Sequence, residues 1–126
     1  MGSKTRVLIV DDDGDFCDFY KRILEEEGYE VEVAGDGHEG LAKALAGGYR
    51  LILLDIRMPG MDGMEVLKQL HEGVPKRENG KVVMMTSYAD SDMSTGARMM
   101  GAAGYVMKVS GADPGQFVKM VKGYLE

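Results

Sequence analysis

The stretch VLIVDDDGDF, residues 7–16, joins a continuous apolar run to three adjacent carboxylates. The apolar part, Val7–Val10, is typical of a strand that is covered on both faces in a parallel sheet. Asp11, Asp12 and Asp13 follow it directly. Two like charges about 4 Å apart repel each other by roughly 4 kcal/mol at an effective dielectric constant of 20. We therefore expect a group that offsets this repulsion close to the end of the strand.

Five short runs along the chain have the character of strands, and amphipathic stretches of helical periodicity separate them. The runs are RVLIV (6–10), VEVA (31–34), LILL (51–54), VVMMT (82–86) and GYVMK (104–108). Asp36 with Glu39, and Asp62 with Glu65, have the three-residue offset of a helix-capping box. Strands and helices that alternate strictly predict a parallel sheet with helices on both faces. The sequence therefore predicts a doubly wound α/β domain with five parallel strands and five helices.

Composition limits the class of protein. A chain of 126 residues, 44% of them hydrophobic, suits one domain with its own core. The net charge of −6 and the lack of a basic stripe argue against direct nucleic-acid binding. Cys17 is the single cysteine, and no apolar run has the length of a membrane span, so a cytoplasmic protein fits best. Residues 1–4 are expected to be an N-terminal tail or an expression remnant, and residues 5–126 the domain.

Polar side chains fall at the carboxyl ends of the predicted strands. The first strand ends in Asp11–Asp13, the third in Asp55, the fourth in Thr86 and the fifth in Lys108. A strand order of 2-1-3-4-5 would place the first and third strands side by side, so that their carboxylates converge on the edge where such sheets bind ligands. A hard cation with oxygen ligands, Mg²⁺ above all and Mn²⁺ as an option, would offset their repulsion. A carboxylate beside this ion, a lysine and a threonine suits phosphoryl transfer, with the carboxylate as nucleophile.

Four segments together resemble the landmarks of response-regulator receiver domains, the family of the chemotaxis regulator. They are LIVDDD, LILLDIRMPGMDG, MMTSYAD and GAAGYVMK, and the likeness runs from Arg6 to Leu125. The resemblance implies a flavodoxin-like fold and a phosphorylation-controlled switch of a two-component system. Asp55 would accept a phosphoryl group from the phosphohistidine of a sensor histidine kinase, or from a phosphotransfer protein, in a Mg²⁺-dependent reaction. Such a domain catalyses its own phosphorylation and dephosphorylation but acts mainly as a regulatory switch.

The resemblance also implies a set of metal ligands. Asp12 would bind Mg²⁺ directly. Asp11 would assist, either directly or through a water molecule between its carboxylate and the ion. Asp55 and the backbone carbonyl of Arg57 would complete the protein ligands.

Three further residues receive roles from the resemblance. Lys108 would pair with Asp55 or with its phosphate, and Thr86 would donate a hydrogen bond to a phosphoryl oxygen. Tyr105 corresponds to the aromatic residue whose rotamer follows the movement of Thr86, although ordinary packing also explains a tyrosine there. The switch would expose or hide surface of the fourth helix and fifth strand for an unknown output partner or a fused output domain. A homodimer through the fourth helix, fifth strand and fifth helix is a further expectation from the family.

The sequence departs from the family pattern at a few positions. Val109 follows Lys108 where family members commonly have proline, and a cis peptide before valine would cost roughly 2.5–4 kcal/mol, so we expect a trans bond. Ser87 stands where a smaller residue is usual and would narrow access to Asp55. Arg57 and Tyr88 occupy positions that influence the lifetime of the phosphoryl group in this family.

Two other functions remain open at this point. A pseudo-receiver would have the same fold and signal by protein binding without phosphorylation, but such proteins typically lack the acceptor, the acidic pair or the lysine. A small Mg²⁺-dependent phosphatase is suggested by DDDGD, residues 11–15, in which Asp11 would be the nucleophile. The DIRMPGMDG loop at residues 55–63 has no place in that class of enzyme.

Overall fold

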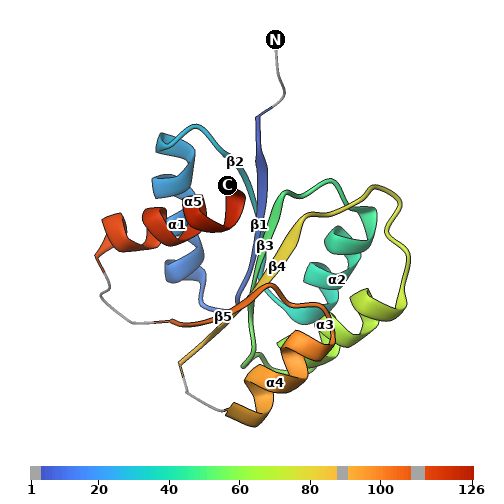
Figure 1. The fold of residues 1–126 in the computed structure, drawn as a ribbon. Helices are drawn as coiled ribbons and strands as arrows, with labels where there is room; N and C mark the ends of the chain where they lie inside the picture. Colours follow the sequence, from blue (N-terminus) through green and yellow to red (C-terminus); the bar gives the residue numbers. More distant parts are fainter. Residues whose placement is uncertain (1–3, 88–90, 109–112) are drawn as a thin grey trace.

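The structure is a computed structural model that describes residues 4–87, 91–108 and 113–126. Strands and helices alternate along the chain (Figure 1). The elements are β1 (Arg6–Val10), α1 (Gly14–Glu26), β2 (Glu30–Ala34), α2 (Gly37–Ala46), β3 (Leu51–Asp55), α3 (Gly63–Glu72), β4 (Lys81–Thr86), α4 (Ser91–Met99), β5 (Gly104–Met107) and α5 (Pro114–Leu125). Among the helices described, none has the length and hydrophobicity that crossing a membrane requires.

The strands form one parallel sheet in the order β2-β1-β3-β4-β5, which confirms the prediction. The chain passes from β1 to β2 on one side and then crosses to β3 on the other side of β1. The strand order therefore reverses between β1 and β3, and open α/β sheets bind ligands outside the carboxyl ends of the strands at such a point. Val10 pairs with Leu54 in the register, so Asp11 and Asp55 are the next residues along two neighbouring strands.

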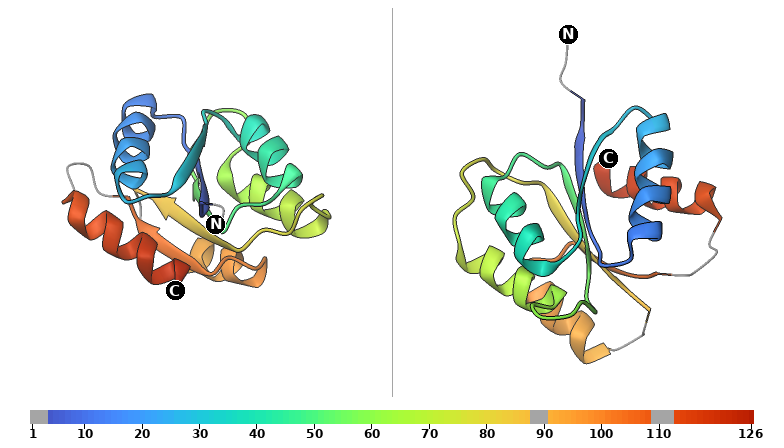
Figure 2. Two further views of the ribbon diagram at one scale, coloured as in Figure 1. Left: turned by 90° about the horizontal axis from the view of Figure 1, so that it is seen from above. Right: turned by 180° about the vertical axis from the view of Figure 1, so that it is seen from behind.

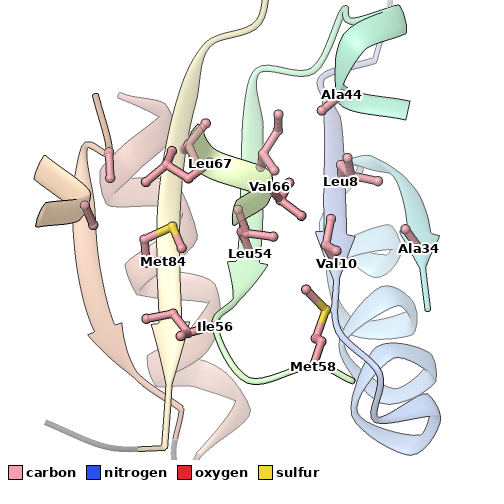
Figure 3. Packing of buried hydrophobic residues seen from close by; sticks show 14 of the residues in the cluster. Leu8, Val10, Ala34, Ala44, Leu54, Ile56, Met58, Val66, Leu67 and Met84 are labelled. Carbon is pink, nitrogen blue, oxygen red and sulfur yellow. The ribbon is translucent and has the colours of Figure 1, made fainter. Parts of the chain in front are cut away.

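Helices cover both faces of the sheet. α1 and α5 lie on one face, and α2, α3 and α4 lie on the other (Figures 1 and 2). Because successive side chains of a strand point to opposite faces, each central strand contributes to two cores. Val7 and Ile9 pack toward α1 and α5, whereas Leu8 and Val10 pack toward α2 and α3. Figure 3 shows the second of these cores, in which Leu54 from β3 lies between β1 and β4.

Two predicted capping boxes begin α2 and α3. The side chain of Asp36 accepts a hydrogen bond from the Glu39 N–H at 2.8 Å, and that of Asp62 accepts one from the Glu65 N–H at 2.9 Å. The Glu39 carboxylate in turn accepts a hydrogen bond from the Gly35 N–H at 2.8 Å. These bonds satisfy N–H groups that have no partner within the helix. They fix the start of α3 directly after the loop that follows Asp55.

Gly63 joins that helix start to the end of β3. Its N–H donates to the Ile56 carbonyl oxygen at 2.8 Å, and an added Cβ would lie 2.2 Å from the Asp55 carbonyl oxygen. Backbone atoms cannot rotate away, so Gly63→Ala should lower the free energy of unfolding by about 1–3 kcal/mol, measured by urea denaturation. The control is Gly14→Ala in α1, where nothing lies within 4 Å of the added carbon. We expect that control to change stability by less than about 1 kcal/mol; equal losses in both variants would contradict the steric explanation.

Candidate functional site

Three carboxylates meet where β1 and β3 end side by side. One oxygen from each of Asp11, Asp12 and Asp55 lies within 4.8 Å of the others. Asp11 is 0% exposed and Asp55 is 5% exposed, whereas Asp12 lies at the exposed rim. Like charges that are both close together and buried raise one another's pKa, unless positive charge is supplied. The arrangement therefore favours a bound cation.

Lys108, directly after β5, supplies part of that positive charge. Its Nζ lies 2.8 Å from Asp11 Oδ2 and 3.8 Å from Asp55 Oδ2. The contact with Asp11 is thus a close ion pair, and it involves a carboxylate oxygen that is buried from solvent. Lys108 therefore pairs with Asp55, as the family resemblance implies, and lies closer still to Asp11. Asp11 is the more deeply buried of the two, and its charge therefore has the greater need of compensation.

The three consecutive aspartates divide into three structural roles. Asp13 is the N-cap of α1, and its side chain accepts the Phe16 N–H at 3.1 Å. Asp11 Oδ1 accepts the Asp13 N–H at 2.9 Å, and the Asp11 carbonyl oxygen accepts the Cys17 S–H at 3.3 Å. Asp12 is exposed between them. Helix capping therefore accounts for one of the three carboxylates and leaves Asp11 and Asp12 for the site.

The electrostatics of the site act most strongly on Asp55. Burial above all, together with the charges of Asp11 and Asp12, raises the pKa of Asp55 to about 7, although Lys108 and the Arg57 N–H act to lower it. Burial alone would lower the pKa of Lys108, but its contact with Asp11 and the charges of Asp11 and Asp55 raise this pKa above its ordinary value. Lys108 therefore carries a full positive charge at neutral pH, where both the protonated and the ionised forms of Asp55 are populated. A protonated carboxyl group is a poor nucleophile, so a cation that favours the carboxylate form also favours reaction.

The raised pKa of Asp55 makes stability depend on pH when divalent ions are absent. The folded chain holds a proton up to about pH 7 that the unfolded chain releases near pH 3.8. The stability that protonated Asp55 contributes is therefore fully present below the pKa of the unfolded chain. It is lost as the pH rises through the pKa of the folded chain. Between pH 5 and pH 8 we expect the free energy of unfolding of the wild type to fall by on the order of 2 kcal/mol relative to that of Asp55→Asn. Urea denaturation of both proteins with a chelator measures the difference, and a constant gap across this range would contradict the assignment.

The remaining predicted residues lie at the same edge or next to it. Thr86 ends β4 and is 1% exposed, and Asp55 pairs with its neighbour Met85 in the sheet. Arg57, two residues after Asp55, is exposed and lines an open cavity of about 440 Å³ together with Met93 of α4.

Tyr105 lies on β5. It is half-buried, and its hydroxyl donates to Met93 Sδ over 4.0 Å. This contact joins β5 to α4, so both the packing role and the switch role remain compatible with its position. Ser87 is exposed. Tyr88, with its expected influence on phosphoryl lifetime, lies outside the described residues. Val109, with its expected trans peptide bond, lies outside them as well.

Phe16 contacts the site, although its sequence pattern predicts no role there. Lys108 Nζ lies 4.4 Å from the centroid of the Phe16 ring. The one signal in the sequence is that Phe16 is an aromatic residue three positions after the acidic run, in the first turn of the predicted helix. That position alone does not reveal which strand end the ring faces.

The donor set fits a hard divalent cation. Three carboxylate oxygens lie close enough to share one ion, and Mg²⁺ prefers oxygen ligands while it keeps several waters. Asp12 faces the exposed rim, where water and a substrate can complete the coordination. The described site contains no histidine or cysteine ligand among these groups, which separates it from the usual structural zinc sites.

Comparison with known proteins agrees with this geometry. Residues 7–122 match the family model of the response regulator receiver domain. The chain is 33% identical over 104 residues to the response regulator ArlR of Staphylococcus saprophyticus, which covers 82% of this chain and 46% of that protein. It is 32% identical over 123 residues to the transcriptional regulatory protein ResD of Bacillus subtilis, with 98% and 49% covered. The chain therefore spans about half the length of these curated relatives.

Solved structures give the same result. The crystal structure of a CheY-like response regulator receiver domain protein from Methanospirillum hungatei is 41% identical, with a TM-score of 0.85 over 98% of this chain and 94% of that one. The response regulator TrrA from Thermotoga maritima, in complex with Mg²⁺-BeF, is 33% identical, with a TM-score of 0.78 over 96% and 99%. The chain belongs to the response regulator receiver domains of two-component systems, whose general function is phosphorylation-based signalling.

Proposed function

We propose that this domain is a switch controlled by phosphorylation of Asp55. The observation that supports this most strongly is the approach of three carboxylates within 4.8 Å, with the Lys108 ammonium 3.8 Å from Asp55 Oδ2. Asp55 is buried and is the last residue of the central strand β3, where a donor can approach from the carboxyl edge of the sheet. Asp11 is already held by Lys108 and by the Asp13 N–H, which makes it the poorer nucleophile.

The proposed reaction is a transfer from nitrogen to oxygen. A carboxylate oxygen of Asp55 attacks the phosphorus of a phosphohistidine on a sensor kinase or a phosphotransfer protein. The new P–O bond forms as the P–N bond breaks, and the leaving imidazole keeps the bonding electrons and takes up a proton. Lys108 stabilises charge on the phosphoryl oxygens, and the Thr86 hydroxyl donates to one of them. A Mg²⁺ or Mn²⁺ ion held by Asp11, Asp12, Asp55 and the Arg57 carbonyl would neutralise the phosphoryl oxygens.

Strands β4 and β5 connect the site with helix α4 at the surface. Thr86 pairs with Met107 in β5, and Tyr105 on that strand contacts Met93 of α4. A shift of Thr86 toward a phosphoryl oxygen would therefore act on β5 and on the Tyr105 contact with α4. We propose that this face, formed by α4, β5 and α5, binds the output partner or a second copy of the chain. Because the chain spans about half of its curated relatives, a fused output domain and a separate partner both fit.

Intact-mass spectrometry tests the proposal. The purified chain is incubated with acetyl phosphate and Mg²⁺, and we expect a gain of one phosphoryl group that maps to the peptide containing Asp55. A pseudo-receiver would gain no mass and release no phosphate. A phosphatase acting through Asp11 would release inorganic phosphate in an Asp55→Asn variant as fast as in the wild type. Either of these results would overturn the assignment of Asp55.

A further inference from the structure

Phe16, at the start of α1, covers one side of the Lys108 ammonium. The Lys108 Nζ lies 4.4 Å from the centroid of the ring, which is within the range of a cation–π interaction. The Lys108 side chain is 15% exposed, so water screens this attraction less than at an open surface. We propose that Phe16 is a positioning residue that holds the Lys108 ammonium between Asp11 and Asp55. The proposal rests on the proposed phosphorylation of Asp55, and it concerns the group that stabilises that reaction.

The ring is itself held in place by other aromatic side chains. Its centroid lies 4.6 Å from that of Tyr20 and 6.4 Å from that of Phe117, with the latter pair edge to face. Tyr20 and Phe117 pack with centroids 4.0 Å apart. These contacts join α1 to α5, and aromatic pairs of this geometry add stability beyond the area they bury. The Phe16 ring therefore presents a fixed face to Lys108.

The backbone of Phe16 is also tied to the acidic site. The Phe16 N–H donates to Asp13 Oδ1 at 3.1 Å, and the Asp13 N–H donates to Asp11 Oδ1 at 2.9 Å. Two consecutive hydrogen bonds thus connect Phe16 with the carboxylate of Asp11, which pairs with Lys108. The position of the ring and the position of the Asp11 carboxylate are set by the same short segment.

Lys108 borders a cavity into which its side chain has room to turn. A cavity of about 250 Å³ lies beside the Lys108 stem, and its lining includes Phe16, Phe117, Gln116 and Met120. A long, flexible lysine side chain next to such a space has several rotamers within reach. The ring favours the observed rotamer because an ammonium that leaves its position over the ring face gives up the cation–π contact. Holding the ammonium near Asp55 before reaction reduces the ordering that the reaction itself requires.

Labelling kinetics test the effect on the reaction. Phe16→Leu keeps an apolar side chain but removes the π face, and we expect the maximal labelling rate with acetyl phosphate and Mg²⁺ to fall about fivefold. The half-saturating acetyl phosphate concentration should change less than twofold, because the ring does not contact the donor. Phe16→Tyr restores a ring and should restore the rate. Phe19→Leu is the matched control, since it makes the same change on α1 in a ring that packs on Tyr20 but does not line the cavity beside Lys108, and it should label at close to the wild-type rate.

A measurement that needs no phosphorylation separates this inference from the proposed function. In the wild type, ring currents of Phe16 should shift the NMR signals of the Lys108 ε-methylene protons upfield. The shift should vanish in Phe16→Leu and persist in Phe16→Tyr and Phe19→Leu. Absence of the shift in the wild type, or equal slowing of labelling by Phe16→Leu and Phe19→Leu, would overturn the positioning role even if Asp55 is phosphorylated. If the shift is present but the wild type takes up no label, the proposed function is wrong and the role in that reaction falls with it.

Discussion

Replacing Asp55 with asparagine is expected to abolish phosphoryl labelling of the chain. Asparagine preserves the shape of a side chain that is 5% exposed, so the core at the end of β3 stays filled. Its neutral amide lacks the carboxylate that would attack the donor, and we expect the labelling rate with acetyl phosphate and Mg²⁺ to fall at least about 1000-fold. Intact-mass spectrometry over a time course measures the loss. Circular dichroism and urea denaturation would show that the variant is folded.

The neighbouring acidic run provides a matched control for this result. Asp13→Asn makes the same chemical change, and asparagine caps a helix as well as aspartate does. Asp13 is exposed and caps α1 through the Phe16 N–H, so labelling of this variant should stay within about threefold of the wild type. If Asp55→Asn takes up label at the wild-type rate, another residue is the acceptor. If both variants lose labelling equally, general loss of negative charge explains the effect rather than loss of the nucleophile.

The fold could be predicted because two kinds of signal agree along the chain. The continuous apolar runs of β1, β3 and β4 belong to strands that helices cover on both faces, and the caps mark where α2 and α3 begin. The differences lie at strand ends. β3 includes Asp55, and β5 ends at Met107, although the Lys108 N–H still donates to the Thr86 carbonyl oxygen. Apolar patterns mark the buried part of a strand, whereas the ladder of hydrogen bonds decides its bounds.

Side-chain contacts that depend on the exact strand register or on the rotation of a helix could not be predicted. Arg6 pairs with Glu30 at 3.0 Å and with Glu32, both on β2. The register that places Arg6 beside Glu30 follows from the tertiary pairing of β1 with β2. In the same way, the sequence places Phe16 on a helix but does not reveal that the ring faces Lys108. The residues that align in register at strand ends could be predicted as one site, whereas the side chains that approach it from helices required the structure.

The last expected result concerns divalent cations, whose removal should slow labelling at least about 100-fold. With a chelator, the pKa of Asp55 near 7 leaves a large fraction of this carboxyl protonated, and three acidic groups within 4.8 Å repel an anionic donor. Mg²⁺ or Mn²⁺ should restore the rate, and Asp12→Ala should raise the Mg²⁺ concentration needed by about tenfold or more. Asp12 is exposed, so this change leaves the core intact. Asp15 is also exposed, at the start of α1, and Asp15→Ala should leave the Mg²⁺ requirement unaltered. Labelling that proceeds at one rate with chelator and with Mg²⁺ would show that the three carboxylates do not act through a shared ion, and equal effects of Asp12→Ala and Asp15→Ala would reduce the role of Asp12 to surface charge.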